Sequence, residues 1–278
     1  MKHLNKYFRL MRVDKPIGTW LLLWPTLWSL FAAAHPNYPS LFLLSIFMLG
    51  SFLMRSAGCV INDIADRNFD PHVERTKSRP IASGEISATK AMFLLITLLG
   101  LALILALQLN NLALTLCPLG ALLAVTYPYT KRIVHWPQFY LGTAFGWGVV
   151  IAWAAQSNQI EISTWLLFLS TLFWAAGYDT IYALMDIEDD IKIGVKSTAI
   201  LFGRHVLLLT AILYCTFLLL LVWVGTLQNL SMIFYFIIAL SALQMAWQIF
   251  MAKHKFFFKA FLSNKWLGAL ILLGFIIG

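Results

Sequence analysis

Nine apolar segments, separated by short polar connections, constrain the fold of this chain more than any other feature of its sequence. A helix of about 20 apolar residues crosses the hydrocarbon core of a bilayer, and most of the segments approach that length. The chain is 60% hydrophobic and only 12% charged, which excludes a soluble globular domain. The sequence therefore predicts an all-α integral membrane protein, built as a single domain over residues 1–278. The expected transmembrane helices lie near residues 17–35, 40–61, 90–108, 110–127, 138–156, 163–185, 205–226, 230–251 and 264–278, the last of them short.

Lys and Arg are distributed unevenly between the connections. Nineteen of the twenty lie before residue 16, in alternate connections or at the span ends next to those connections, and only Arg55 lies deep inside an expected span. Because Lys and Arg accumulate on the cytoplasmic side of a membrane, we expect the N-terminus and the basic loops in the cytoplasm and the C-terminus outside. This distribution places the positive charges next to the membrane surface, which accounts for the net charge of +8. Nucleic acid is therefore not an expected partner.

Two short acidic clusters hold seven of the twelve carboxylates. Asn62, Asp66 and Asp70 are spaced i, i+4, i+8, and Asp186 and Asp190 are spaced i, i+4, so each set is expected to line one helix face. Such oxygen ligands are those that Mg²⁺ prefers, and a cation between them could hold an anionic ligand. Both clusters lie on the predicted cytoplasmic side. The alternative, a solvated acidic surface, is disfavoured because carboxylates are scarce elsewhere and both clusters repeat at helical spacing.

Basic residues follow each cluster and complete the predicted ligand site. Carboxylates alone would repel a diphosphate, so Mg²⁺ must bridge the two while Lys and Arg bind the remaining phosphate oxygens. Arg75, Lys77 and Arg79 follow the first cluster, and Lys192 and Lys196 follow the second. Lys131 and Arg132, in the shortest basic loop, either hold phosphate as well or serve only as a membrane anchor. The sequence therefore predicts a Mg²⁺–diphosphate site at the cytoplasmic end of a membrane domain.

Two ionisable residues lie deeper in the predicted membrane region. Arg55 precedes Asn62 by seven residues, and Asp179 precedes Asp186 by the same interval. An ionised group inside a span costs at least about 2.5 kcal/mol, so it normally faces a cavity or a partner. Arg55 therefore either pairs with Asp179 or binds the carboxylate of a second, aromatic acid substrate.

A diphosphate held at the mouth of an apolar protein suggests a lipid diphosphate whose tail lies among the helices. Mg²⁺ and basic side chains would stabilise the charge that develops on the departing diphosphate. An allylic tail would then leave as a carbocation. Aromatic rings, among them Tyr127 and Tyr178, could stabilise that cation through their faces.

The two acidic clusters resemble the paired signatures of the UbiA-type intramembrane aromatic prenyltransferases. Asn62–Asp70 matches NDxxDxxxD and Asp186–Asp190 matches DxxxD, with no departure within either motif. The resemblance covers roughly residues 9–205 and is greatest to the branch that acts on 4-hydroxybenzoate. Further similar stretches are Arg12-Val13-Asp14-Lys15-Pro16-Ile17-Gly18-Thr19-Trp20, Leu22–Trp28, Arg55-Ser56-Ala57-Gly58-Cys59, Arg79-Pro80, Gly177-Tyr178-Asp179-Thr180 and Gly194-Val195-Lys196-Ser197-Thr198-Ala199.

The resemblance implies nine helices around one central cavity that opens sideways to membrane lipid. It also implies Mg²⁺-dependent transfer of a polyprenyl group from polyprenyl diphosphate to the carbon ortho to the hydroxyl of 4-hydroxybenzoate. This reaction belongs to ubiquinone biosynthesis, which points to a bacterial inner membrane. One Mg²⁺ would be held by Asn62, Asp66 and Asp70 and the other by Asp186 and Asp190, while Lys131, Arg132 and Lys196 match positions that bind diphosphate.

Three other functions compete with this prediction. Naphthoate, homogentisate and haem farnesyl enzymes share the acidic motifs, so only the stretches around Asp14–Trp20 and Trp24-Pro25 separate them. A transporter would place its polar sites near the middle of the bilayer, where only Arg55 and Asp179 qualify. A phospholipid head-group transferase needs a DGxxAR-type pattern, which the sequence lacks.

Overall fold

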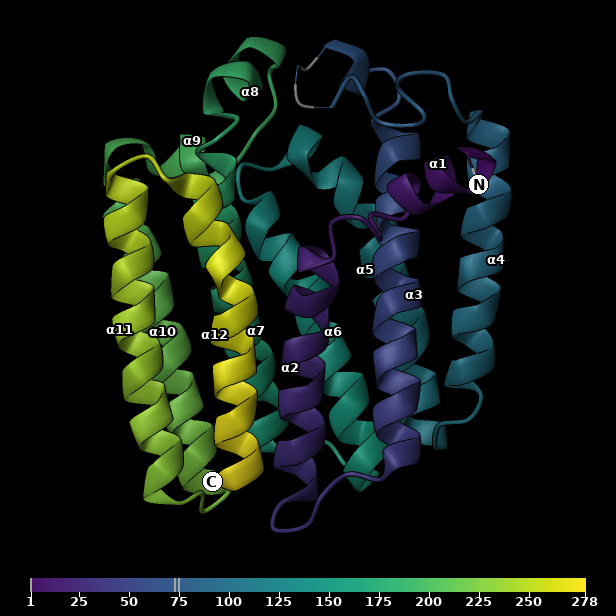
Figure 1. Cartoon of the computed structure of the whole chain (residues 1–278). Coiled ribbons are helices and arrows are strands. Elements are labelled where there is room, and N and C mark those ends of the chain that lie inside the picture. Colours follow the sequence, from purple (N-terminus) through teal and green to yellow (C-terminus); the bar gives the residue numbers. More distant parts are fainter. Residues whose placement is uncertain (1, 73, 75) are drawn as a thin grey trace.

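The structure, a computed structural model, describes residues 2–72, 74 and 76–278. All regular secondary structure in these residues is helical, which confirms the predicted all-α class. The long helices run alongside one another and form a bundle (Figure 1). They are α2 (Ile17–Ala34), α3 (Leu41–Ala65), α4 (Ala88–Ala106), α5 (Asn111–Ile133), α6 (Pro137–Ser157), α7 (Ile162–Ala183), α10 (Val206–Leu227), α11 (Met232–Lys253) and α12 (Phe257–Ile277).

Seven helical segments in the described part of the chain are long and apolar enough to cross a membrane. Helices α6 and α7 are 21 and 22 residues long, but Trp, Tyr, Gly, Ser and Thr make them less apolar. Both lie inside the bundle: α6 packs against α2, α5 and α7, and α7 packs against α10 and α12 as well. Helices that contact other helices instead of lipid tolerate small and polar residues, which explains their lower hydropathy.

Short helices gather at one end of the bundle. Figure 1 shows α1 (Lys2–Leu10), α8 (Ile187–Ile193) and α9 (Thr198–Phe202) at this end, whereas α12 finishes at the other. The two short 3₁₀ helices, η1 (Asp70–His72) and η2 (Gly203–His205), belong to the connections there. Both acidic clusters lie in this region, so we refer to it as the polar end.

Two helix boundaries differ from the sequence-based expectation. Helix α5 continues past residue 127 to Ile133, so Lys131 and Arg132 belong to its last turn and not to a loop. Long basic side chains extend from a helix end towards water while their stems stay against apolar neighbours, so they need not end a helix. Helix α12 was expected to be short but has 21 residues, because it begins at Phe257, directly after a turn that contains Lys255 in the left-handed conformation.

Aromatic side chains form much of the core on the α7 side. The Trp28 and Trp174 rings lie 5.0 Å apart, and Trp174 stacks on Phe217 at 5.8 Å. The Trp28 indole donates a hydrogen bond to the Gly268 carbonyl at 3.0 Å, and that of Trp174 donates to Asn264 at 2.9 Å. These contacts fix α2, α7, α10 and α12 relative to one another and so define one side of the cavity described below.

Candidate active site

A cavity of about 1460 Å³ lies between α2, α3, α4, α5, α6, α7 and α12. At the polar end its wall carries the acidic and basic side chains of both clusters. Far from that end its wall is apolar and includes Ile46, Phe47, Leu105 and Leu109. The cavity therefore joins a charged mouth to a long apolar interior, the shape that a lipid diphosphate requires.

The structure brings the sequence-predicted site residues together around this cavity. Arg75 alone among them lies outside the described residues. Their roles stay predictions, because position in a wall does not establish what a side chain binds. The cavity wall contains Arg55, Asn62, Asp66, Asp70, Arg79, Tyr127, Lys131, Arg132, Tyr178, Asp179, Asp186, Asp190 and Lys196.

The first motif, Asn62–Asp70, spans the end of α3 rather than one continuous helix face. Helix α3 ends at Ala65, and Asp66 is its C-cap residue. Backbone hydrogen bonds from Asp66 N–H to the Asn62 carbonyl and from Asp70 N–H to the Asp66 carbonyl, both 2.9 Å, extend the turn. The predicted single face is therefore wrong in detail, but the local turns keep the three side chains at the cavity wall.

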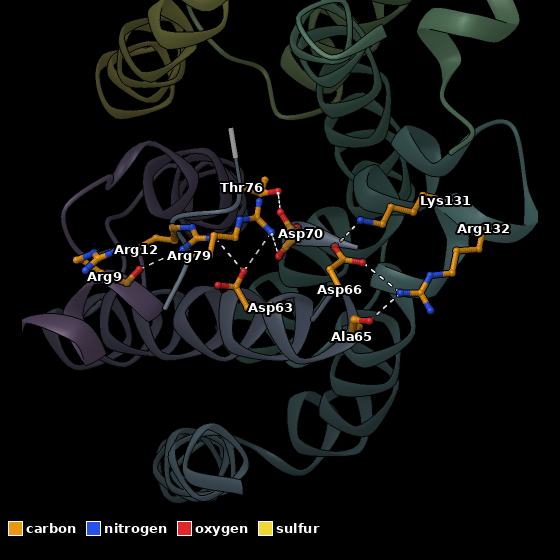
Figure 2. Close-up of polar contacts among 10 residues, drawn as sticks. All are labelled: Arg9, Arg12, Asp63, Ala65, Asp66, Asp70, Thr76, Arg79, Lys131 and Arg132. Atoms are coloured by element: carbon orange, nitrogen blue, oxygen red, sulfur yellow. Dashed lines mark hydrogen bonds and ion pairs between the residues drawn. The ribbon is translucent and has the colours of Figure 1, made fainter. Parts of the chain in front are cut away.

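Basic side chains from α5 surround Asp66, which is only 1% exposed. Lys131 Nζ donates a short hydrogen bond to Asp66 Oδ2. Arg132 Nη2 donates to Asp66 Oδ1 at 3.2 Å and to the Ala65 carbonyl at 2.8 Å. Figure 2 shows both basic side chains converging on this carboxylate. Two cationic side chains and one carboxylate therefore already meet here. These groups suit a metal–diphosphate complex, because the carboxylate can bind the metal ion and the cations can bind the phosphate oxygens.

A second ion-pair network lies beside the first and was missed by the sequence reasoning. Arg79 Nη1 lies 2.9 Å from Asp70 Oδ2 and 3.3 Å from Asp63 Oδ1. Arg12 Nη2 donates to the same Asp63 oxygen at 2.8 Å (Figure 2). Thr76 Oγ1 donates to the backbone carbonyl of Asp70 at 3.0 Å. Asp63 stands inside the motif, but no sequence signal joins it to Arg12, 51 residues away.

Burial and neighbouring charges act on Asp70 in opposite directions. Loss of hydration raises the pKa of the Asp70 carboxyl above its ordinary value, and the charge of Asp66 adds to this effect. The guanidinium of Arg79 lowers the pKa of the same carboxyl, but by less than burial raises it. A bound cation would also lower the pKa of the Asp70 carboxyl, as the Arg79 guanidinium does.

The second motif, Asp186–Asp190, lies on its own short helix. Helix α7 ends at Ala183, and Asp186 is the N-cap residue of α8. Asp190 N–H donates to the Asp186 carbonyl at 2.8 Å, so the i, i+4 spacing holds within α8. Asp179 and Asp186, seven residues apart, do not lie on one continuous helix, because the chain leaves helical geometry between Ala183 and Asp186. Both motif carboxylates are half-buried.

Lys196 contacts the end of α5 from the loop that follows α8. Its backbone N–H donates to the Lys131 carbonyl at 3.0 Å, and its Nζ donates to the Ile133 carbonyl at 2.8 Å. The loop after the second motif is thereby attached to the helix end that contacts the first motif. Lys77 and Lys192, by contrast, are exposed and pair with Glu74 and Asp189.

A second cluster of polar side chains lies deeper in the cavity, on the walls formed by α3, α5 and α7. Tyr127 on α5 lies within electrostatic range of Arg55, Asp66 and Asp179, and Tyr178 on α7 is within range of Arg55 and Asp179. The Arg55 guanidinium also lies against Gly18 of α2, where a Cβ atom would come within 2.3 Å of it. The two interpretations of Arg55, pairing with Asp179 or binding a carboxylate, both stay open.

The residues at the mouth fit a hard divalent cation. No group of three or more His, Cys, Asp or Glu side chains in the described ranges is already gathered as a metal site. The donors that line the mouth are nevertheless carboxylate and amide oxygens, and they come from both motifs. Oxygen-only ligand sets suit Mg²⁺, which keeps several water molecules and binds phosphate oxygens as well. The donor chemistry therefore supports Mg²⁺ over a transition metal.

Comparison with known proteins gives consistent matches over nearly the whole chain. The sequence profile of the UbiA prenyltransferase family matches residues 22–275. A protein of Nitrosococcus oceani named 4-hydroxybenzoate octaprenyltransferase is 50% identical, covering 95% of this chain and 94% of its own. A protein of the same name from Enterobacter sp. is 48% identical, covering 96% and 93%.

Solved structures show the same helical arrangement. The apo structure of a UbiA homologue from Aeropyrum pernix K1 matches with a TM-score of 0.82 at 26% identity, over 94% of this chain and 97% of that one. A UbiA homologue from Archaeoglobus fulgidus bound to GPP and Mg²⁺ matches with a TM-score of 0.70 at 21% identity, over 97% and 98%. The second likeness concerns the fold alone.

Proposed function

Because the chain belongs to the UbiA prenyltransferase family, we propose that it transfers a polyprenyl group from polyprenyl diphosphate to 4-hydroxybenzoate. The new bond forms at the ring carbon ortho to the hydroxyl, in the pathway to ubiquinone. The relatives from Nitrosococcus oceani and Enterobacter sp. carry the name of this reaction. Their coverage of almost the whole chain supports the same activity here.

One structural observation carries the proposal. The two acidic motifs are more than a hundred residues apart, yet both line the mouth of one cavity whose far end is apolar. Neither motif alone could hold the two phosphates of a diphosphate through metal ions. Together they supply oxygen ligands on two sides, while the apolar interior accommodates the prenyl chain.

The mouth would hold the diphosphate by charge. Asn62, Asp66 and Asp70 would bind one Mg²⁺, and Asp186 and Asp190 the other. When bound, Mg²⁺ supplies Lewis-acid stabilisation of the negative charge on the leaving diphosphate. The remaining phosphate oxygens would accept hydrogen bonds from the basic residues of the wall, namely Arg79, Lys131, Arg132 and Lys196. Arg75, which lies outside the described residues, is proposed as a further phosphate ligand from the sequence alone.

Transfer would proceed by loss of diphosphate from the allylic carbon. The C1–O bond breaks and its electron pair leaves with the diphosphate, and the electron-rich ring then forms the new C–C bond to C1. The ring proton leaves last, with Asp186 as the proposed acceptor. Tyr127 and Tyr178 would stabilise the cation through their ring faces. The apolar, aromatic wall would also exclude water, which would otherwise trap the cation.

Arg55 would orient the acceptor. Its guanidinium lies in the cavity wall below the first motif, within range of Tyr127 and Tyr178. A bidentate bond to the carboxylate of 4-hydroxybenzoate would fix the ring and point its hydroxyl end towards C1. Asp179, on the opposite wall, would hold the Arg55 guanidinium in position.

We place the site on the cytoplasmic side of a bacterial inner membrane. The proposal has nine transmembrane helices, with α6 and α7 added to the seven that hydropathy identifies. The polar end carries most of the Lys and Arg, so it would face the cytoplasm together with α1, while α12 would end outside.

Direct assay of the purified protein tests the proposal. Detergent-solubilised protein, Mg²⁺, 4-hydroxybenzoate and prenyl diphosphates of several lengths should yield 3-prenyl-4-hydroxybenzoates, identified by mass. Naphthoate and homogentisate acceptors in parallel reactions distinguish the related enzymes. Transfer to one of these acceptors but not to 4-hydroxybenzoate would overturn the substrate assignment, and Mg²⁺-independent transport without transfer would overturn the enzyme class.

A further inference from the structure

Asp63 lies within the first motif but has a different environment from its neighbours. It is 1% exposed, and its described partners are two guanidinium groups, those of Arg12 and Arg79. Both bonds use Oδ1. Its second oxygen, Oδ2, is buried and has no hydrogen-bond partner among the described residues. A buried carboxylate oxygen without a donor is costly, so it calls for an explanation.

Arg79 is shared between Asp63 and Asp70. The same nitrogen, Nη1, lies 2.9 Å from Asp70 Oδ2 and 3.3 Å from Asp63 Oδ1. Asp70 is one of the residues proposed to bind Mg²⁺, and Arg79 is proposed to bind phosphate. When Asp70 engages a cation, its carboxylate is shared between that ion and the Arg79 guanidinium, so a second carboxylate is needed to keep Arg79 directed at the phosphate.

We propose that Asp63 is a positioning residue that retains Arg79 at the cavity mouth when Asp70 engages the cation. Its open Oδ2 lets the carboxylate take a second N–H from Arg79 as Asp70 is shared with the cation. This inference rests on the proposed function, since it requires a metal-bound diphosphate at the mouth. Asp63 itself touches neither substrate nor metal in this role.

The N-terminal segment fixes Asp63 in turn. Arg12 adopts a left-handed backbone conformation with φ of 58°, which is sparsely populated for a residue with a side chain. Its guanidinium donates to Asp63 and, at 3.2 Å, to the Arg9 carbonyl. Arg9 binds the Glu85 carboxylate at 3.0 Å and the Ser78 carbonyl, next to Arg79, at 2.7 Å (Figure 2 shows Arg9 and Arg12). These bonds tie the segment before α2 to the loop that carries Arg79.

Geranyl diphosphate binding with Mg²⁺, without an aromatic acceptor, tests the inference apart from turnover. Isothermal titration of the full chain in detergent should give about tenfold weaker binding for Asp63→Asn, because a displaced charge-assisted contact is lost. The matched control is Glu74→Gln, which removes an exposed carboxylate, paired with Lys77, from the loop that carries Arg79 and should bind as the wild type does. In an Arg79→Gln background, Asp63→Asn should weaken binding no further, since the two act as one unit.

Two results would overturn the inference. Asp63→Asn could lower the thermal midpoint while leaving geranyl diphosphate affinity unchanged, which would make its role purely structural. Alternatively, the effects of Asp63→Asn and Arg79→Gln could add fully, which would mean that Asp63 does not act through Arg79. If Asp63→Asn fails to fold, Arg12→Gln removes the support of the same carboxylate and is judged by the same criteria.

The assay also separates this inference from the proposed function. Wild-type protein that binds geranyl diphosphate with Mg²⁺ but does not alkylate 4-hydroxybenzoate would overturn the proposed reaction while leaving the Asp63 comparison readable. Wild-type protein that does not bind the diphosphate at all would overturn both.

Discussion

The two acidic motifs share one cavity mouth but are built differently. In the first motif, Asp63 and Asp66 are each 1% exposed, and basic side chains from distant parts of the chain surround them. In the second motif, Asp186 and Asp190 are half-buried on a seven-residue helix beyond the end of α7. One motif is embedded in the bundle, whereas the other lies on an accessory element above it.

The difference follows from the cost of burying charge. A carboxylate inside the bundle stays ionised only if cations compensate it, so the first motif brings its own Arg and Lys. Removing one partner there leaves buried charges unbalanced. A half-buried carboxylate in the first turn of a short helix keeps much of its hydration and gains from the helix dipole. We therefore expect the first motif to serve stability and ligand binding together, and the second to serve chiefly ligand binding.

The largest effect is expected from Asp66→Ala. The substitution removes a proposed metal ligand and leaves Lys131 and Arg132 without their shared anion. Transfer should fall to background, and unfolding free energy should drop by about 2 kcal/mol, the order expected for hydrogen bonds to charged groups. Product formation and the thermal midpoint in detergent measure the two effects. Near-normal transfer by this variant would refute the two-motif site.

Asp190→Ala should separate function from stability. Transfer should again fall to background, because the second proposed metal loses a ligand, but the thermal midpoint should change less than in Asp66→Ala. Glu188→Ala, which removes an exposed carboxylate from the same helix, is the matched control and should retain transfer. A midpoint loss in Asp190→Ala as large as that in Asp66→Ala would mean that the two motifs are structurally equivalent, and our comparison would be wrong.

The sequence predicted the elements of both motifs, because their information is local. Hydrophobic length placed the helices to within a few residues in most cases, and i, i+4 spacing identified Asp66, Asp70, Asp186 and Asp190. The spacing wrongly predicted a continuous helix at two places where a backbone turn interrupts it, at Asp66 and between residues 183 and 186. Polar residues keep the same spacing on both sides of each turn, so the sequence does not reveal the break.

Long-range pairing was beyond the sequence. Nothing in the chain indicates that Arg12 reaches Asp63, or that Lys131 and Arg132 meet Asp66 and not only a membrane surface. These contacts depend on how α1, α3 and α5 pack, which is decided by the whole bundle. The residues of both motifs were therefore expected at one site and line one cavity, but the ion-pair partners of the embedded motif were not predicted, and the roles of both motifs stay predictions.

A smaller effect is expected below the first motif, at Gly18. A Cβ added there would lie 2.3 Å from the Arg55 guanidinium, and this flexible group can shift without disturbing the backbone. Gly18→Ala should therefore raise the KM for 4-hydroxybenzoate by about fivefold, less than the loss expected from removing the charged donor entirely in Arg55→Ala. The KM for the prenyl diphosphate should stay constant, because its proposed ligands are elsewhere.

The control for Gly18→Ala is Gly100→Ala on α4, where an added Cβ meets nothing within 4 Å. It should leave both KM values unchanged. If Arg55→Ala itself left the KM for 4-hydroxybenzoate unchanged, Arg55 would serve the α3 wall by pairing only, and the wall that carries the first motif would lose its proposed role in acceptor binding.

The smallest effect concerns the pH dependence of the embedded motif without metal. Burial, ahead of the opposing charge of Arg79, raises the pKa of the Asp70 carboxyl in the folded protein. A carboxyl with a raised folded pKa favours folding most when protonated, so its contribution is full below the ordinary value of 3.8 and is lost as pH rises through the folded value. In chelator, wild-type protein should therefore lose thermal stability relative to Asp70→Asn as pH rises through this window. A difference between the two proteins that does not vary with pH would show that Arg79 fully offsets burial, and one that changes in the opposite direction would show that Arg79 outweighs it. In either case the first motif would be better compensated than its depth in the bundle implies.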